Sequence, residues 1–340
     1  MNKKNKTYII AEAGVNHNGD LEIAKKLISK AKEIGVDCIK FQTFKTENLI
    51  TPNAPKAEYQ LKTTNPEDSQ FNMLKRLELS YSDFSLLFNY CKKQKIDFIS
   101  TPYNFEDVDF LNELGVEYFK IASGQLTELP FIEYVAKKNK KVILSTGMSG
   151  LHEIYEAVQL IKQQSNSQVS VLQCTTNYPS GIEEANLNCI KTIRDSCNVE
   201  VGYSDHVLGN YACFGAVALG ATIIEKHFTL DKKSDGPDHL CSADPLDFKD
   251  LVAGIRAIEK SLGSKIKEIS PLEAKNVFGM KRSLVAKTEI KKGDYFNKNN
   301  VTFKRPKNGL DINYYPLIIG KKSKVDIIEN ELIEFNKIEF

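Results

Sequence analysis

The chain of 340 residues has no tryptophan, only four methionines, and no apolar run approaching the ~18 residues that a membrane span requires. Its first residues, Met1 to Lys6, are polar and lead straight into a short apolar run. They therefore lack the hydrophobic core of a signal peptide, and we expect a cytoplasmic protein.

A surplus of charge of one sign is also missing, because 46 Lys and Arg residues face 44 Asp and Glu residues, which leaves a net charge of +2. So small an excess gives no broad field for binding nucleic acid or an acidic membrane surface. The hydrophobic share of 41% is that of a globular protein, which excludes disorder as the overall state.

Paired cysteine motifs are absent as well. The seven cysteines are scattered and form no Cys-x-x-Cys pair, so we expect buried free thiols in a reducing compartment, without disulfides or a structural zinc site. The chain also contains no P-loop, no Gly-x-Ser-x-Gly elbow and no dinucleotide-binding glycine fingerprint, so none of the chemistries that these motifs serve is indicated.

What the sequence does contain is a series of short apolar runs that alternate with amphipathic stretches such as Leu21–Ile34 and Ser82–Lys93. The runs expected to be strands are 8–11, 38–41, 98–99, 118–122, 142–144, 169–172, 199–202 and 222–224. Strands that alternate with helices pair in parallel, because a parallel connection needs a crossover. Eight such units in about 250 residues predict a (β/α)8 TIM barrel, an α/β fold. A doubly wound open sheet is the alternative, but the glycine-rich turn that usually follows its first strand is missing here.

The remaining sequence predicts a second, small domain. We divide the chain into a TIM-barrel catalytic domain at 1–263, a polar linker at 264–280 and a β-rich domain at 281–340. In the small domain we expect short strands at 283–286, 301–303 and 316–319, and a turn at 291–294. About 60 residues bury little core alone, so this domain should pack on a barrel, its own or a partner's. The long segment from Thr43 to Ser80 is expected to be a lid or binding loop.

Polar residues follow nearly every predicted strand, and in a barrel these carboxyl ends converge on one mouth. His206 and His227 end neighbouring strands; imidazoles suit a divalent transition metal, although a hydrogen-bonded core histidine is the alternative for each. Lys40 and Lys120 end two further strands and, together with nearby hydroxyls, predict a pocket for a phosphate or a carboxylate. Either lysine is also a candidate for a Schiff base. Glu12 is a candidate for holding sugar hydroxyls or moving a proton, or for a salt bridge to a lysine.

Several short sequence motifs, taken together, are specific enough to indicate a protein family. EAGVNHNGD, IKFQTF, STPYN, FKIASGQ, LSTGMS, CTTNYPS, GYSDHVLGNYA, IIEKHFTLD and GPDH occur in this order. They resemble the sialic acid synthase (N-acetylneuraminate synthase) family. The later strings RSLVA, IKKGD and KRPKNGL resemble that family's antifreeze-protein-like (SAF) domain. The resemblance runs from about Ile10 to Gly320.

The resemblance implies a transferase that condenses phosphoenolpyruvate with N-acetylmannosamine, giving N-acetylneuraminate and phosphate, with a divalent metal (Mn²⁺ or Mg²⁺) and no Schiff base. The implied catalytic residues are Glu12, His206 and His227, and the two histidines are also the implied metal ligands. The implied phosphoenolpyruvate contacts are Lys40, Thr101, Lys120, Ser123, Ser145 and Ser204. The implied sugar contacts are Gln42, Tyr103, Gln125, Tyr178, Asp238 and Arg305.

The resemblance also implies a head-to-tail, domain-swapped homodimer, because Arg305 matches an arginine that reaches the sugar's N-acetyl group from the partner subunit. Two positions depart from the family pattern. Gln125 stands where several members have Glu, which removes a charge and bears on the choice of sugar. Thr176 stands where some members have Asn in contact with phosphoenolpyruvate.

Three alternatives stay open at this point. Within the family, the chain would instead be an N,N'-diacetyllegionaminate synthase, whose acceptor sugar is 2,4-diacetamido-2,4,6-trideoxy-mannose. This switch of acceptor requires changes at only a few residues of the pocket. Outside the family, the chain would be a Schiff-base aldolase or a non-catalytic sugar-binding protein. Borohydride trapping with pyruvate identifies the aldolase, and phosphate release from phosphoenolpyruvate separates an enzyme from a binding protein.

Overall fold

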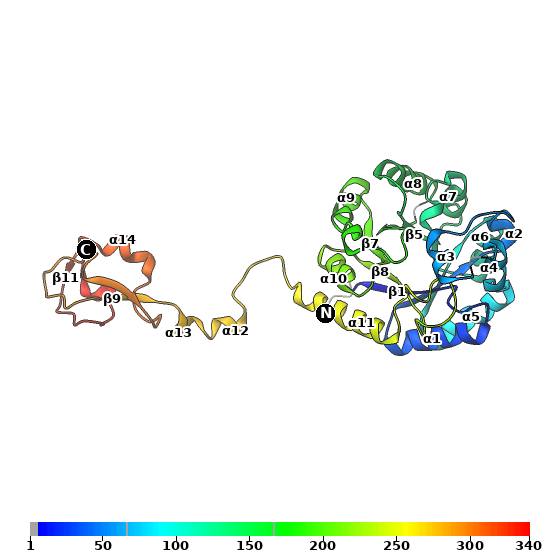
Figure 1. Ribbon diagram of the computed structural model, residues 1–340. Helices are drawn as coiled ribbons and strands as arrows, with labels where there is room; N and C mark the ends of the chain where they lie inside the picture. Colours follow the sequence, from blue (N-terminus) through cyan, green and yellow to red (C-terminus); the bar gives the residue numbers. More distant parts are fainter. Residues whose placement is uncertain (1–5, 66, 166) are drawn as a thin grey trace. The chain divides into compact units, whose positions relative to one another are not determined.

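The computed structural model describes residues 6–65, 67–165 and 167–340, and it forms two compact units that divide between Gly263 and Ser264 (Figure 1). Residues 1–5, most of the polar amino terminus noted above, lie outside the described residues. None of the helices in the described ranges is long and apolar enough to cross a membrane.

The first unit is the predicted TIM barrel, and the structure confirms this fold. Its strands are β1 (Tyr8–Gly14), β2 (Cys38–Thr43), β3 (Asp97–Pro102), β4 (Tyr118–Ile121), β5 (Lys141–Ser145), β6 (Val169–Cys174), β7 (Glu200–Asp205) and β8 (Ile223–His227). They pair in the order β3-β2-β1-β8-β7-β6-β5-β4, all in parallel, and β3 packs beside β4. The helices α1 (Leu21–Ile34), α5 (Tyr81–Gln94), α6 (Phe105–Leu114), α7 (Leu129–Ala136), α8 (Leu151–Gln164), α9 (Asn188–Cys197), α10 (Tyr211–Ala218) and α11 (Pro245–Ser261) surround the strands (Figure 1).

Local sequence signals set the ends of these helices. At the start of α1 the Asp20 carboxylate accepts hydrogen bonds from the backbone N–H groups of Glu22 and Ile23. Gly35 ends α1 in the left-handed region at φ 90°, where a residue with a Cβ would be strained. These two caps set where α1 begins and ends, so that the chain leaves the helix close to the start of β2.

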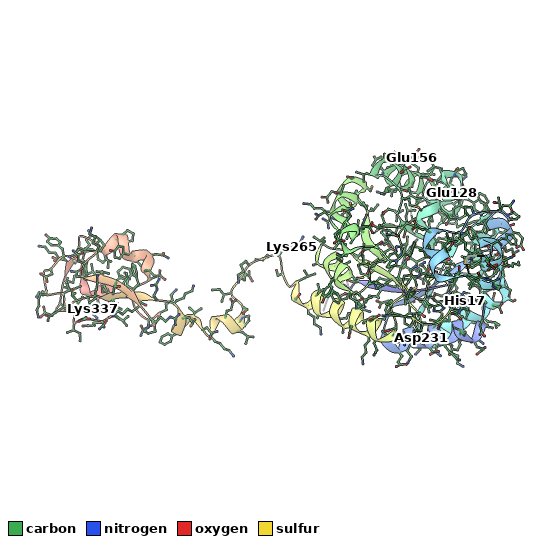
Figure 2. All side chains as sticks on the ribbon, in the orientation of Figure 1. His17, Glu128, Glu156, Asp231, Lys265 and Lys337 are labelled. Carbon is green, nitrogen blue, oxygen red and sulfur yellow. The ribbon has the colours of Figure 1, made fainter. Side chains whose placement is uncertain are left out.

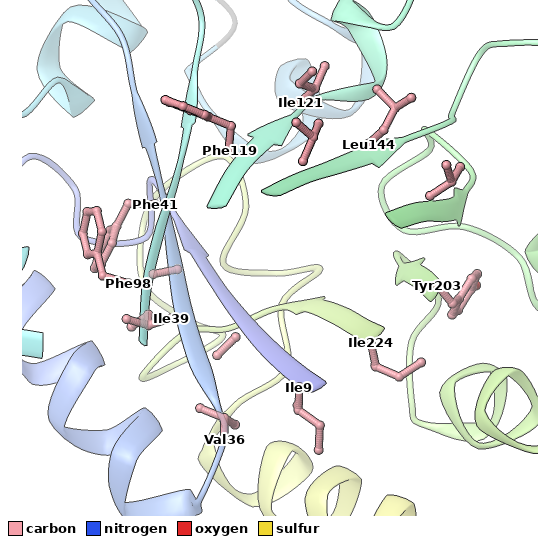
Figure 3. Packing of buried hydrophobic residues seen from close by; sticks show 14 of the residues in the cluster. Ile9, Val36, Ile39, Phe41, Phe98, Phe119, Ile121, Leu144, Tyr203 and Ile224 are labelled. Atoms are coloured by element: carbon pink, nitrogen blue, oxygen red, sulfur yellow. The ribbon is translucent and has the colours of Figure 1, made fainter. Parts of the chain in front are cut away.

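Alternation along the strands divides their side chains between two cores. Outward residues such as Ile9, Ile39 and Ile224 pack under the helices, as Figure 3 shows. Inward residues fill the interior with a smaller cluster: Ile10, Cys38, Ile99, Ile143, Leu172 and Ile223. Full burial of one such aliphatic side chain stabilises the fold by about 1.5–3 kcal/mol. The next inward position on each strand lies at the mouth, where the polar residues occur.

The segment between β2 and α5 differs from the plain loop that the sequence suggested. It contains three short helices, α2 (Thr46–Leu49), α3 (Glu58–Thr63) and α4 (Gln70–Leu77). Met73 and Leu77 of α4 are buried against Val15 and Phe44, so this segment has a small core of its own. The reason is that α4 carries an apolar stripe at helical spacing and starts at a serine cap, Ser69.

The second unit begins with two short helices, α12 (Pro271–Ala274) and α13 (Val277–Met280), in the region expected to be a plain linker. In it β9 (Ser283–Ala286) pairs antiparallel with β10 (Val301–Lys304), and β11 (Lys322–Ser323) with β12 (Ile338–Glu339). Its buried core includes Leu284, Phe296 and Ile338. The expected strand at 316–319 is wrong: α14 (Tyr315–Ile318) occupies it, because Pro316 sits in a first helical turn, where its missing N–H is no loss.

We predict that Gly202→Ala destabilises the barrel by about 1–3 kcal/mol, because the interior has no room for an added methyl group. A Cβ on Gly202 would lie 2.5 Å from the carbonyl oxygen of Ile223 and 2.5 Å from Leu172 Cδ2. Gly124→Ala is the matched control, since its Cβ would meet nothing within 4 Å. Chemical denaturation measures both, and equal unfolding free energies would contradict the packing argument.

Candidate active site

A cavity of about 400 Å³ opens at the carboxyl ends of the barrel strands. Its lining includes most of the residues that the sequence singled out, drawn from seven strands of the barrel and from the loops that follow the strands: Glu12, Lys40, Gln42, Thr101, Tyr103, Lys120, Ser123, Gln125, Ser145, Tyr178, Ser204, His206 and His227. Leu49, Tyr59 and Glu128 line it as well, and Glu128 is labelled in Figure 2. The barrel thus brings residues separated by over 200 positions into one pocket.

The floor of this cavity holds four charged side chains that are almost fully buried. Lys40 Nζ lies 2.7 Å from Glu12 Oε2 and 3.6 Å from Glu225 Oε1, and Lys120 Nζ lies 3.9 Å from that same Glu225 oxygen. Each of these side chains is at most 7% exposed. A buried charge needs an opposite charge or hydrogen bonds, so the two lysines and two glutamates stabilise one another.

Burial and pairing shift the proton affinities of this group in different directions. Burial raises the pKa of Glu12, against the lowering effect of Lys40. Burial lowers the pKa of Lys120, and Glu225 offsets this only in part. Although burial alone would lower it, the pKa of Lys40 is raised, because Glu12 and Glu225 both stabilise its charged form. Lys40 is therefore the more firmly held cation of the two.

Hydroxyl groups surround the lysines. Lys120 Nζ donates to Ser145 Oγ at 2.6 Å, and Lys40 Nζ contacts Thr101 Oγ1 at 3.4 Å. Ser204 Oγ donates to Glu225 at 3.3 Å, and Ser123 Oγ accepts from the backbone N–H of Gly147 at 3.0 Å. Ammonium groups with hydroxyl donors beside them form the kind of pocket that holds a phosphate or a carboxylate.

The two histidines lie side by side, with ring centroids 5.5 Å apart. His206 Nδ1 is 2.7 Å from the carbonyl oxygen of Thr175, which fixes the orientation of the ring. His227 Nδ1 is buried without a hydrogen-bond partner among the described residues, and burial lowers its pKa well below the usual range. The Tyr178 ring packs against the His206 ring, with centroids 4.0 Å apart and the ring planes tilted by 40°.

This pair fits a metal ion, because an orphaned buried imidazole nitrogen is the atom that a bound cation satisfies. Within the described ranges no three His, Cys, Asp or Glu side chains are grouped to hold a metal ion. The chain therefore offers two imidazoles, and further ligands would come from water or a substrate. Asp238 Oδ2 lies 3.9 Å from His227 Nδ1, and burial raises the pKa of Asp238 to about 6.

Three of the remaining predicted contacts, Gln42, Tyr103 and Gln125, form a hydrogen-bonded wall next to Glu12. Gln42 Nε2 donates to Glu12 Oε1 at 3.0 Å, and the Tyr103 hydroxyl contacts Gln42 Oε1 at 3.4 Å. Gln125 Nε2 reaches the carbonyl oxygen of Tyr103 at 3.4 Å. The wall is made of neutral donors and acceptors that suit sugar hydroxyls and amides. Arg305 lies in the second unit, which is described by itself, and its side chain is exposed.

Glu225 and Tyr59 are two of the cavity residues that sequence reasoning missed. Glu225 is a polar residue within the apolar run that ends at His227. Because residues two apart on a strand face the same side, Glu225 had to face the barrel interior with His227, and this spacing could have identified it. Tyr59 had no such signal. It comes from α3 in the segment between β2 and α5, and its ring lies 4.9 Å from the Tyr178 ring. By contrast, His17 (Figure 2) accepts a backbone hydrogen bond from Gly19 in the loop after β1 and does not line the cavity.

Comparison with known proteins identifies related chains. A model of the NeuB family matches residues 27–267, and a model of the SAF domain matches residues 281–339. The chain is 48% identical to N,N'-diacetyllegionaminic acid synthase of Campylobacter jejuni, over 96% of this chain and 99% of the relative. It is 35% identical to human N-acetylneuraminate-9-phosphate synthase, over 96% of this chain and 91% of the relative. A solved N-acetylneuraminic acid synthetase from Leptospira borgpetersenii superposes with a TM-score of 0.72 at 35% identity, covering 80% of this chain and 90% of that one.

We predict that Lys40→Met lowers the free energy of unfolding by about 3–5 kcal/mol, because it leaves Glu12 buried without its cation. The double variant Lys40→Met/Glu12→Gln should recover part of this loss. The matched control is Lys137→Met on the surface, where Lys137 is 57% exposed and pairs with Glu133 at 2.7 Å. Its loss should stay below about 1 kcal/mol. Similar losses for Lys40→Met and the surface variant would show that the buried charges do not depend on one another.

Proposed function

The chain belongs to the NeuB family and ends in a SAF domain, and on that premise we propose that it condenses phosphoenolpyruvate with an N-acylated mannosamine-type sugar. It is an enzyme of the sialic-acid-synthase type, as its named relatives are synthases that share nearly its whole length. The observation that carries the proposal is the pairing, in one cavity, of a lysine–hydroxyl anion pocket with two adjacent histidines.

In the proposed reaction the anion pocket holds phosphoenolpyruvate. Lys40 and Lys120 bind its phosphate and carboxylate, with hydroxyl groups from Thr101, Ser123, Ser145 and Ser204 as further donors. The C2–C3 double bond of phosphoenolpyruvate opens to form a bond between C3 and the aldehyde carbon of the open-chain sugar. The aldehyde oxygen takes up a proton and becomes a hydroxyl group, while positive charge develops at C2. Water then adds at C2, and phosphate leaves with cleavage of the bond between C2 and the bridging oxygen. Holding both substrates in one orientation removes most of the entropic cost of bringing them together.

His206 and His227 would hold the divalent metal, Mn²⁺ or Mg²⁺. When bound there, such an ion supplies Lewis-acid polarisation of the sugar aldehyde. Glu12 lies between Lys40 and Gln42, where it can orient sugar hydroxyls or accept a proton released in the reaction. Gln42, Tyr103, Gln125, Tyr178 and Asp238 are the proposed sugar contacts on the same side.

The acceptor has two candidates. The first is N-acetylmannosamine, which would make the chain an N-acetylneuraminate synthase. The second is 2,4-diacetamido-2,4,6-trideoxy-mannose, the acceptor for N,N'-diacetyllegionaminate. The 48% identity to a protein named for that product supports it. So does the uncharged, buried Gln125, because a deoxy sugar with a second acetamido group presents an amide and a methyl group in place of hydroxyls.

We also propose a homodimer in which the SAF domain of each chain caps the partner's barrel. Residues 281–340 contain 13 Lys and Arg against eight Asp and Glu, whereas residues 1–263 contain 30 against 34, so the two parts carry opposite net charges. The loops after β7 and β8 expose apolar side chains that a cap would cover, such as Leu208 at 60% and Leu240 at 64% exposure. Arg305 would then reach the partner's site.

All seven cysteines are free, which supports our proposal of a reducing, cytoplasmic location.

We predict that phosphate is released from phosphoenolpyruvate only when an acceptor sugar and a divalent metal are both present. The two acceptors are compared in parallel, each with and without a chelator, and the higher kcat/KM identifies the physiological sugar. The buried Lys120, with its lowered pKa, makes a Schiff-base aldolase the rival enzyme. If borohydride traps pyruvate covalently on the protein and the activity is insensitive to the chelator, the aldolase is supported and the synthase proposal is contradicted. Absence of phosphate release with every sugar would favour the non-catalytic sugar-binding protein.

We predict that two inactive variants restore each other's activity when co-expressed. Arg305→Ala should lose sugar turnover, and His227→Ala should lose metal-dependent turnover while its Tm stays within a few degrees of wild type. A mixed dimer contains one intact site, so random pairing gives about a quarter of wild-type activity if the arginine acts across a twofold interface. No recovery in a preparation shown by mass to contain mixed dimers would rule out an arginine donated by the partner.

A further inference from the structure

A second buried ion pair lies behind the histidines, outside the cavity. Asp205 of β7 and Lys226 of β8 are partners in the strand register, and Lys226 Nζ lies 2.5 Å from Asp205 Oδ2. The side chains are 0% and 4% exposed. Because the neighbouring residues Ser204 and Glu225 point into the barrel, strand alternation places this pair on the outer face, under α10.

The hydrogen bonds of the pair converge on the backbone next to His206. Asp205 Oδ1 accepts from the backbone N–H of Val207 at 3.0 Å, and Lys226 Nζ donates to the carbonyl oxygen of Val207 at 2.6 Å. Tyr203 and Cys213 complete the arrangement, with contacts to the two Asp205 oxygens at 3.0 and 3.1 Å. His206 therefore lies between two residues whose positions this one network fixes.

The network is also connected to the second histidine, His227, because Lys226 is its neighbour in the sequence. His227 directly follows Lys226, and its carbonyl oxygen accepts from the backbone N–H of Ala243 at 2.8 Å. Burying both charges costs several kcal/mol before they attract one another, and a well-packed apolar pair is often as stable. The network therefore adds little to the stability of the fold, yet its hydrogen bonds go to the backbone of the residue next to His206. We take its role to be the positioning of that histidine.

We infer that Asp205 and Lys226 are positioning residues that hold His206 and His227 at the separation needed to share one divalent metal ion. The inference rests on the proposed function, because it takes the two histidines to be the metal ligands. Neither residue touches the cavity; both act through the histidine backbones. Supporting groups behind metal ligands typically raise metal affinity by about 10- to 100-fold.

The test measures binding of Mn²⁺ alone to the full-length protein by electron paramagnetic resonance of the free ion. Asp205→Asn/Lys226→Met removes both charges together, so that neither is left buried and unpaired. We expect its Mn²⁺ affinity to fall about 10- to 100-fold. The Mn²⁺ concentration for half-maximal phosphate release should rise in parallel, with the KM for phosphoenolpyruvate unchanged.

The matched control is Asp37→Asn/Arg256→Met. It removes a different ion pair, 2.8 Å apart and only partly buried, that ties α11 to the base of the barrel and has no contact with either histidine. We expect this variant to lose thermal stability and to keep wild-type Mn²⁺ affinity. Equal weakening of Mn²⁺ binding in both double variants would overturn the inference, because the effect would then follow from general destabilisation.

Three other outcomes are decisive. Mn²⁺ affinity within twofold of wild type in Asp205→Asn/Lys226→Met would show that the pair is purely structural, while the metal assignment stands. Equal Mn²⁺ binding by wild type and His227→Ala would overturn the metal assignment itself, and this inference with it. If the double variant does not fold, Tyr203→Phe removes a single hydrogen bond to Asp205 and should weaken Mn²⁺ binding roughly threefold; unchanged affinity would count against the inference.

Discussion

The structure depends most on the burial of two ammonium groups and two carboxylates at one end of a barrel. Lys40, Lys120, Glu12 and Glu225 are all nearly inaccessible, and each would be costly alone. Together they form a charged floor whose cations are already desolvated and fixed in place. An anionic substrate entering this cavity meets preorganised charges, so little reorganisation is needed when the reaction begins.

The alternation of side chains along the strands gives the barrel wall two different uses. Inward residues of β7 and β8, such as Ser204, Glu225 and His227, line the cavity. Their outward neighbours, Asp205 and Lys226, form the ion pair behind it. Because successive residues face opposite sides, chemistry and its support are encoded at adjacent positions of the same two strands. A single substitution in either strand can thus alter the site without touching a substrate.

Much of this arrangement could be predicted, and the failures have physical reasons. The apolar runs located every strand of the barrel, although β1 extends to Gly14, three residues beyond the predicted end at residue 11. The strand proposed at 316–319 is a helix, because a short apolar run does not distinguish the two states and Pro316 favours a first helical turn. Tyr59 was missed, since its helix is placed over the mouth by tertiary contacts such as the hydrogen bond from Thr63 to the carbonyl oxygen of Pro237.

The sequence by itself determined the barrel, the polar ends of its strands and the chemical character of the mouth, because these follow from local periodicity and residue type. Only the tertiary structure decided that Lys40 pairs with Glu12, that Glu225 stands between two lysines, and that one nitrogen of His227 has no partner in the described part of the chain. Those relations join residues far apart in the sequence. Their distances are set by strand register and barrel closure, which no local pattern records.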